Sequence, residues 1–92
     1  MQVKIIDYGL LKDSKKYYVK YRVFDINENT LNKLKDRVED KLEVKSGELF
    51  LTVYFDEGYF PFGSDESKFR RHDFIAREEI EMTAYLVSIL ED

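Results

Sequence analysis

The chain contains no cysteine, and this absence excludes disulfide bonds, cysteine zinc sites and thiol nucleophiles. Its single histidine, His72, excludes a multi-histidine metal site, and we expect it to be an exposed loop residue rather than a catalytic base. The few glycines are scattered, so neither a phosphate-binding loop nor a dinucleotide fingerprint is present. We therefore expect no catalytic residues, no metal site and no cofactor, and we expect that the protein is not an enzyme.

Long hydrophobic runs are missing as well. No stretch of about 18 apolar residues occurs, so we expect neither a transmembrane helix nor a membrane partner. Residues 1–7 lack the basic-then-apolar layout of a signal peptide. Together with the absence of cysteine, these features favour a cytoplasmic protein.

The composition favours one small domain over residues 1–92, because 43% hydrophobic residues can build one modest core and 37% charged residues can cover it. The net charge of −4 is unevenly distributed, since residues 1–24 carry +4 and the remainder carries −8. This asymmetry favours an anionic partner or pairing with a second copy. Alternatively, the lysines only cover the exposed side of a hairpin.

Two strands are predicted at residues 3–11 and 17–26, joined by a polar connection at 12–16. Gly9 in the first strand indicates a bulge or a site of close backbone approach. The second strand alternates with a period of two, which is typical of a half-buried strand. One of its faces carries Tyr17, Val19, Tyr21 and Val23, and the other carries Tyr18, Lys20, Arg22 and Phe24.

An amphipathic helix is predicted over residues 28–45. Asn27 or Asn29 can cap its first turn by accepting a backbone hydrogen bond. Gly47 can supply the left-handed conformation that commonly ends a helix. The single apolar stripe, which must pack on a sheet, consists of Leu31, Leu34, Val38 and Leu42.

Residues 48–56 predict the most apolar strand of the chain. Apolar side chains occur on both of its faces, which indicates a central strand covered on two sides, or a strand covered by a partner. Residues 57–67 are rich in turn-forming residues and predict a loop.

The C-terminal segment, residues 74–90, can be either a helix or a strand. Residue propensities favour a helix, whereas residues 79–86 alternate between polar and apolar without interruption. On a helix, Glu79 and Thr83 would also occupy the arc that the core needs. We therefore predict a strand. The result is a two-layer α+β domain, a mainly antiparallel sheet packed by one amphipathic helix, of order ββαββ, or ββαβα if the segment is helical.

The strand at residues 17–26 is the best candidate for contact with nucleic acid, because it interleaves cations with rings on which bases can stack. An overall pI near 5.0 argues against this interpretation. The alternative is a structural strand whose lysines extend over apolar surface. The candidate nucleic-acid-binding residues are Lys15, Lys16, Tyr18, Lys20 and Arg22.

The loop residues Tyr59, Phe60 and Phe62 are the candidate anchors for a protein partner, because clustered rings form compact binding hot spots. Alternatively, they fold back and close one end of the core.

Without a catalytic set, the leading hypothesis is a small acidic accessory or inhibitor protein that acts by protein–protein contact. The partner's identity is open, and self-association into a homodimer is one form of such contact. The alternative is binding of RNA or single-stranded DNA.

Overall fold

The structure is a computed structural model that describes residues 1–11, 16–56 and 67–91. Its elements follow the order ββαββα, with four antiparallel strands in one sheet and two helices. The predicted α+β class and antiparallel sheet are confirmed. Each of the two predicted orders lacks one element, for the reasons given below.

The first two strands, β1 (Gln2–Leu11) and β2 (Lys16–Phe24), form the predicted antiparallel hairpin. The connection at residues 12–15 lies outside the described part of the chain. The alternation predicted for β2 is confirmed, because Tyr17, Val19, Tyr21 and Val23 are all buried. Their burial makes β2 the centre of the core.

A bulge occurs in β1, but at Ile6 rather than at Gly9, because the pairing register shifts between Ile5 and Asp7. Gly9 instead permits a close approach. A Cβ atom there would lie 3.0 Å from Cε1 of Tyr18, so the Tyr18 ring occupies the space above this glycine.

The first helix, α1, spans Glu28–Arg37 and begins as predicted, since the Thr30 N–H donates to Oδ1 of Asn27 at 2.8 Å. Its predicted core residues Leu31, Leu34 and Val38 are buried. The prediction that this helix continues to residue 45 is wrong.

Residues 41–45 form a strand instead, β3 (Lys41–Lys45). Leu42 and Val44 alternate with charged residues, and they pair with Leu51 and Leu49 of the neighbouring strand. An extended segment directs both apolar side chains to the core side of the sheet, where Leu42 packs against the core while Val44 stays 38% exposed.

Gly47 is not a helix cap. Ser46 and Gly47 both have positive φ, 52° and 76°, and they connect β3 to β4 (Glu48–Asp56) as a two-residue hairpin turn. Such turns require the left-handed conformation at both positions, so the glycine meets the predicted backbone requirement in a different element.

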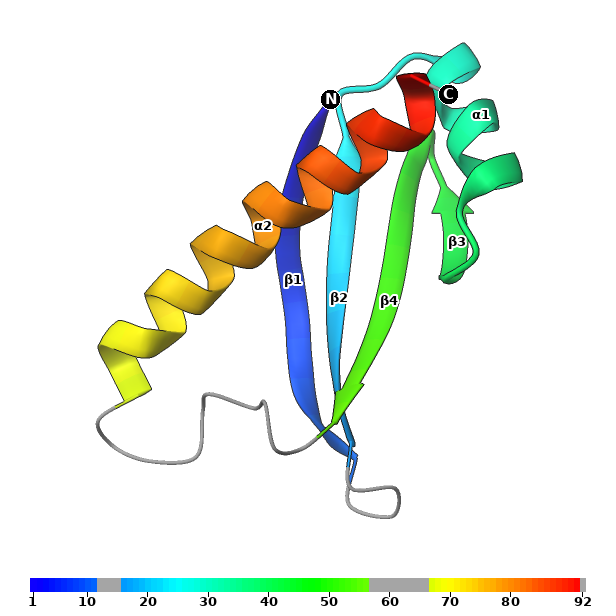
Figure 1. The fold of residues 1–92 in the computed structure, drawn as a ribbon. Helices are drawn as coiled ribbons and strands as arrows, with labels where there is room; N and C mark the ends of the chain where they lie inside the picture. Colours follow the sequence, from blue (N-terminus) through cyan, green and yellow to red (C-terminus); the bar gives the residue numbers. More distant parts are fainter. Residues whose placement is uncertain (12–15, 57–66, 92) are drawn as a thin grey trace.

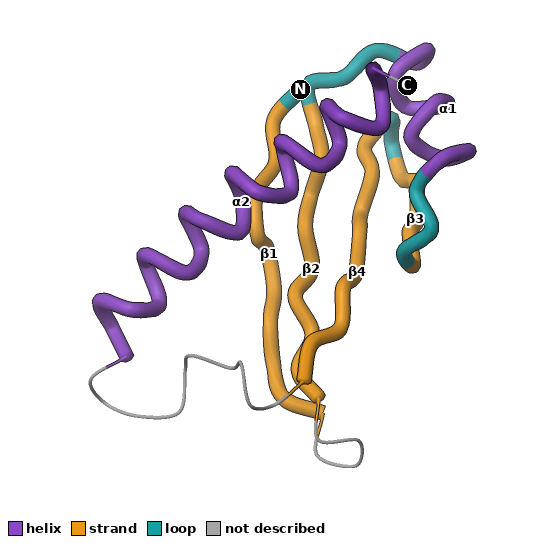
Figure 2. Tube along the Cα trace, viewed as in Figure 1, coloured by secondary structure: helices purple, strands orange, loops and turns teal. Residues whose placement is uncertain are grey.

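The strand order in the sheet is β1-β2-β4-β3, so the predicted strand at residues 48–56 is interior. Figure 2 shows the sheet with the long helix lying across one of its faces. The prediction that this strand, β4, is interior is confirmed. Described elements cover only one of its two faces.

The C-terminal segment forms α2 (Ser67–Glu91), a helix of 25 residues, and the predicted strand is wrong. Figure 1 shows α2 crossing the sheet diagonally, with its C-terminal end beside α1. Phe74, Met82 and Leu86 are buried in the common core. Arg37 joins the two helices by donating to the carbonyl of Ile89 at 2.8 Å.

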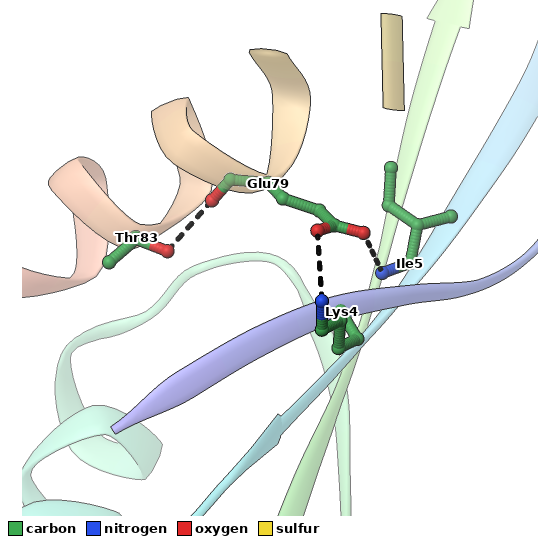
Figure 3. A network of polar contacts seen from close by, with 4 residues as sticks. All are labelled: Lys4, Ile5, Glu79 and Thr83. Carbon is green, nitrogen blue, oxygen red and sulfur yellow. Dashed lines mark hydrogen bonds and ion pairs between the residues drawn. The ribbon is translucent and has the colours of Figure 1, made fainter. Parts of the chain in front are cut away.

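The polar residues that argued against a helix make specific contacts on its sheet side (Figure 3). The Ile5 N–H donates to Oε1 of Glu79 at 3.2 Å, and Nζ of Lys4 lies 3.9 Å from Oε2 of Glu79. The Thr83 hydroxyl donates to the carbonyl of Glu79 at 2.7 Å. These hydrogen bonds thus offset the free-energy cost of partly burying the polar side chains of Glu79 and Thr83 on the sheet side of the helix.

Candidate binding surface

The two faces of the sheet differ in what covers them. Both helices contribute to the core on the side of Tyr17 and Tyr21, whereas no described element lies over the opposite side. We call this opposite side the open face. The strand register assigns to it Gln2, Lys4, Asp7, Gly9 and Leu11 of β1, Lys16, Tyr18, Lys20, Arg22 and Phe24 of β2, Glu48, Phe50, Thr52, Tyr54 and Asp56 of β4, and Lys41, Glu43 and Lys45 of β3.

Aromatic side chains occupy the two interior strands of the open face. Tyr18 lies directly opposite Tyr54, and Phe50 lies opposite Arg22 on the same pair of strands. Tyr54 is 46% exposed, which is high for a ring at the centre of a sheet. Exposed rings on rigid strands are suited to stacking or to packing against a partner.

Tyr18 is held in place by two neighbours on β1. Its hydroxyl donates to Oδ2 of Asp7 at 3.0 Å, and its ring lies over Gly9. This hydrogen bond to a carboxylate is the main reason that the pKa of the Tyr18 hydroxyl is raised. The ring is therefore a preorganised part of the open face.

Arg22 is already engaged on the open face. Its guanidinium forms two hydrogen bonds with the carboxylate of Glu48, one from Nε to Oε2 at 2.9 Å and one from Nη2 to Oε1. These bonds lower the pKa of Glu48 and raise that of Arg22. The guanidinium also lies 4.2 Å from the ring centroid of Phe24. Arg22 thus serves the face as a structural cation.

Three other cations of the open face, Lys16, Lys20 and Lys41, make no ion pair with any described residue. Lys20 lies 5.8 Å from the ring centroid of Phe50. Across the sheet, Lys20 and Lys41 flank the same residue, Thr52 of β4. Lys20 and Lys41 therefore lie two residues along the strands from Tyr18 and Tyr54, which are cross-strand neighbours, and Asp7 lies opposite Lys20 on β1.

The open face has a different charge balance from the whole chain. Its basic side chains are Lys16, Lys20, Arg22, Lys41 and Lys45 and its acidic ones are Asp7, Glu43, Glu48 and Asp56, because the Lys4 ammonium lies near Glu79 of α2 instead. Residues 73–91 of α2 are acidic, with Asp73, Glu78, Glu79, Glu81 and Glu91 against Arg77, whereas residues 67–72 of the same helix add three basic residues. The excess negative charge of the whole chain therefore does not describe the open face.

The predicted candidates are brought together only in part. Lys16, Tyr18, Lys20 and Arg22 all lie on the open face, while Lys15 lies outside the described residues. The predicted protein anchors Tyr59, Phe60 and Phe62 also lie outside them. His72 lies in α2 and not in a loop as predicted, and its side chain is outside the described part of the structure.

Sequence reasoning missed Phe50, Tyr54 and Lys41 as members of this surface. The alternation of residues 48–56 placed Phe50 and Tyr54 on one side of a strand, and it was the only available signal. Their position beside β2 follows from antiparallel pairing between segments distant in the sequence.

A second group of polar side chains lies in the core between β2 and α2. The buried Tyr21 hydroxyl donates to Oε2 of Glu78 at 3.5 Å. Burial raises the pKa values of Tyr21 and Glu78, and the charge of Glu81 raises that of Glu78 further. Tyr17 is equally buried, stacked on Phe55 with ring centroids 5.0 Å apart. These groups are packed as core, so they offer no surface to a ligand.

The described residues form neither a metal site nor a membrane-spanning helix. Within the ranges given above, no three histidine or acidic side chains are grouped so that they could hold a metal ion. None of the helices in these ranges is long and apolar enough to cross a membrane.

The fold, one antiparallel sheet with helices on one face, makes the chain a small two-layer α+β protein. It belongs to DUF5750, a family of unknown function, whose model matches residues 2–92. No curated protein matches the chain.

Proposed function

We propose that this chain is a non-enzymatic binding module of the cytoplasm that holds single-stranded nucleic acid on its open face. The observation that carries the proposal is the position of Lys20 and Lys41 next to Tyr18 and Tyr54, on the face of the sheet that no described element covers. Cations that neutralise phosphates, next to rings that stack on bases, are the two elements of sequence-tolerant single-strand recognition.

Each group has a distinct role in this proposal. Tyr54 and Tyr18 supply stacking surfaces, and stacking contributes roughly 1–3 kcal/mol per base. Lys16, Lys20 and Lys41 contact phosphates, because they make no ion pair with the described residues. Arg22 stays paired with Glu48 and keeps the surface rigid.

The acidic pI of the whole chain does not oppose the proposal, because a bound phosphate interacts mainly with the charges close to it. Interactions between exposed charges fall off over about 8–10 Å at physiological salt. The acidic residues of α2 lie in the other layer, across the sheet from the open face. A phosphate on the open face therefore interacts mainly with the lysines of that face.

The direct test is titration of the protein into a fluorescently labelled, mixed-sequence single strand, followed by fluorescence anisotropy at about 50 mM salt. Three phosphate contacts predict a logarithmic salt slope near −2, because each contact contributes about −0.7 for single strands. The affinity should then fall roughly 20-fold between about 50 and 200 mM salt.

Substitutions distinguish the open face from the rest of the surface. Tyr54→Ala should weaken binding about 5- to 150-fold, the equivalent of one lost stacking contact. Tyr85→Ala is the matched control, since Tyr85 lies on α2 and is 42% exposed. Lys20→Ala should reduce the salt slope, whereas Lys35→Ala on α1 should leave it unchanged. Undetectable binding at low salt, or equal losses in Tyr54→Ala and Tyr85→Ala, would contradict the proposal.

Contact with a protein partner is the second candidate function. The observation that favours it is the exposure of large apolar side chains on α2, where Ile80 is 70% exposed. An accessory or inhibitor protein would use such a face on a rigid helix as its anchor. Loss of binding to a purified partner in Ile80→Asp, but not in Tyr54→Ala, would distinguish this function from the first.

A further inference from the structure

The side of α2 that faces away from the sheet carries an apolar stripe with a charge near each end. Met82 and Leu86 are buried on the opposite side of this helix. No described element lies over the stripe in Figure 1. We call this side the outer face, and its exposed residues are Asp73, Ala76, Arg77, Ile80, Glu81, Ala84, Val87, Ser88 and Glu91.

The sheet edges offer a poorer route to self-association than this helix. On the edge strand β1, the Ile5 N–H already donates to Glu79, and the Tyr8 N–H donates to Oδ1 of Asp7 at 2.9 Å. The bulge at Ile6 interrupts the same strand. The other edge strand, β3, has only five residues, and charged and apolar side chains alternate along it. Occupied amides, a bulge and a short charged edge all oppose strand pairing between molecules.

We propose that a second copy of this chain packs on the outer face, with the two α2 helices antiparallel and Ala84 at the two-fold axis. Arg77 and Glu91 are each seven residues from Ala84, in opposite directions. A two-fold axis at Ala84 therefore places Arg77 of each copy beside Glu91 of the other. The charges at the two ends of the stripe are thus complementary in this register.

The centre of this register suits close packing. Ala84 has a small side chain, so the helices can approach closely where they cross. Ile80 of each copy then lies opposite Ser88 of the other, and Glu81 lies opposite Val87, so the interface is mixed in polarity.

The dimer is expected to be weak. A single helix face is smaller than the roughly 1,200–2,000 Å² that specific interfaces usually bury. A dissociation constant of about 10 µM to 1 mM fits that limit. Because the outer face and the open face lie on opposite sides of the molecule, the dimer would present two open faces directed away from each other.

Sedimentation equilibrium over about 10 µM to 1 mM protein tests the dimer. The expected result is a rise in mass from the 11.0 kDa monomer toward twice that value. Ile80→Asp should raise the dissociation constant at least about tenfold. Ile6→Asp is the matched control, because Ile6 is also exposed but lies on the β1 edge. Circular dichroism should show both variants folded.

A charge swap tests the register. Arg77→Glu should weaken the dimer by placing two acidic side chains together, and combining it with Glu91→Arg should restore the affinity.

A mass of one chain at about 1 mM would overturn the dimer. Dissociation by Ile6→Asp but not by Ile80→Asp would assign association to the β1 edge instead. No restoration by the double substitution would overturn the antiparallel register. Tyr54→Ala should leave the mass unchanged, so this proposal and nucleic-acid binding can fail separately.

Discussion

Glu79 shows how one polar residue can direct the docking of a helix. It lies on the sheet side of α2, where its carboxylate accepts the Ile5 N–H and lies near Lys4. Its backbone carbonyl also accepts the Thr83 hydroxyl. Because β1 is an edge strand, this carboxylate satisfies an amide that no neighbouring strand can reach.

Replacing Glu79 with Ala should lower the free energy of unfolding by about 1–3 kcal/mol, because the Ile5 N–H is partly buried and loses its acceptor. Urea denaturation measures this change. Glu79→Gln retains an acceptor oxygen and should recover most of the loss. Glu81→Ala removes an exposed carboxylate from the same helix and should change stability by less than about 0.5 kcal/mol. Equal effects of Glu79→Ala and Glu81→Ala would mean that the contact with Ile5 contributes nothing.

At the scale of elements, α1 depends on burial of its narrow apolar stripe. Leu34 is fully buried, and the stripe packs with residues of α2 and the sheet. A ten-residue helix is too short to be stable alone in water, so docking must supply its stability.

Leu34→Ala should therefore cost about 2–5 kcal/mol, the usual range for a buried leucine. Lys35→Ala, on the exposed side, should change stability by less than about 0.5 kcal/mol. Thermal or urea unfolding of the two variants provides the comparison. Small effects at both positions would show that α1 is not docked in solution.

At the scale of the whole molecule, the buried contact between the layers makes stability depend on pH. Burial raises the pKa of Glu78, and Tyr17, Tyr21, Arg77 and Glu81 are the titratable or charged groups around it. Below its unfolded pKa of about 4.5, Glu78 is protonated in both states and imposes no penalty. As pH rises through the folded pKa, ionisation disfavours the folded state.

Glu78→Gln should therefore raise the melting temperature at pH 7, and its advantage over the wild type should disappear below about pH 4.5. Glutamine can still accept from the Tyr21 hydroxyl, so the hydrogen bond is kept. Melting curves at several pH values measure the difference, and Glu39→Gln serves as the control, because Glu39 is exposed and is not among the charges that shift the pKa of Glu78. An advantage for Glu78→Gln that is the same at pH 4 and pH 7 would contradict this assignment.

Local periodicity determined several features of this protein directly. The alternation in β2, the Asn27 cap and the buried positions of Leu31, Leu34 and Val38 each depend on neighbours within a few residues. The requirement for a left-handed backbone at Gly47 is equally local. Such features could be predicted from the sequence because the interactions that create them are short-range.

Tertiary structure decided the features that depend on distant partners. Residues 41–45 became a strand because β4 offered an edge with which they could pair, and this pairing packs Leu42 against the core. The alternating C-terminal segment became a helix that buries Phe74, Met82 and Leu86 in the common core, and its Glu79 accepts the distant Ile5 N–H. The open face arose when β2 and β4 paired and placed Tyr18 opposite Tyr54. Local pattern cannot specify these outcomes, because each is stabilised by contacts formed only after the chain has folded.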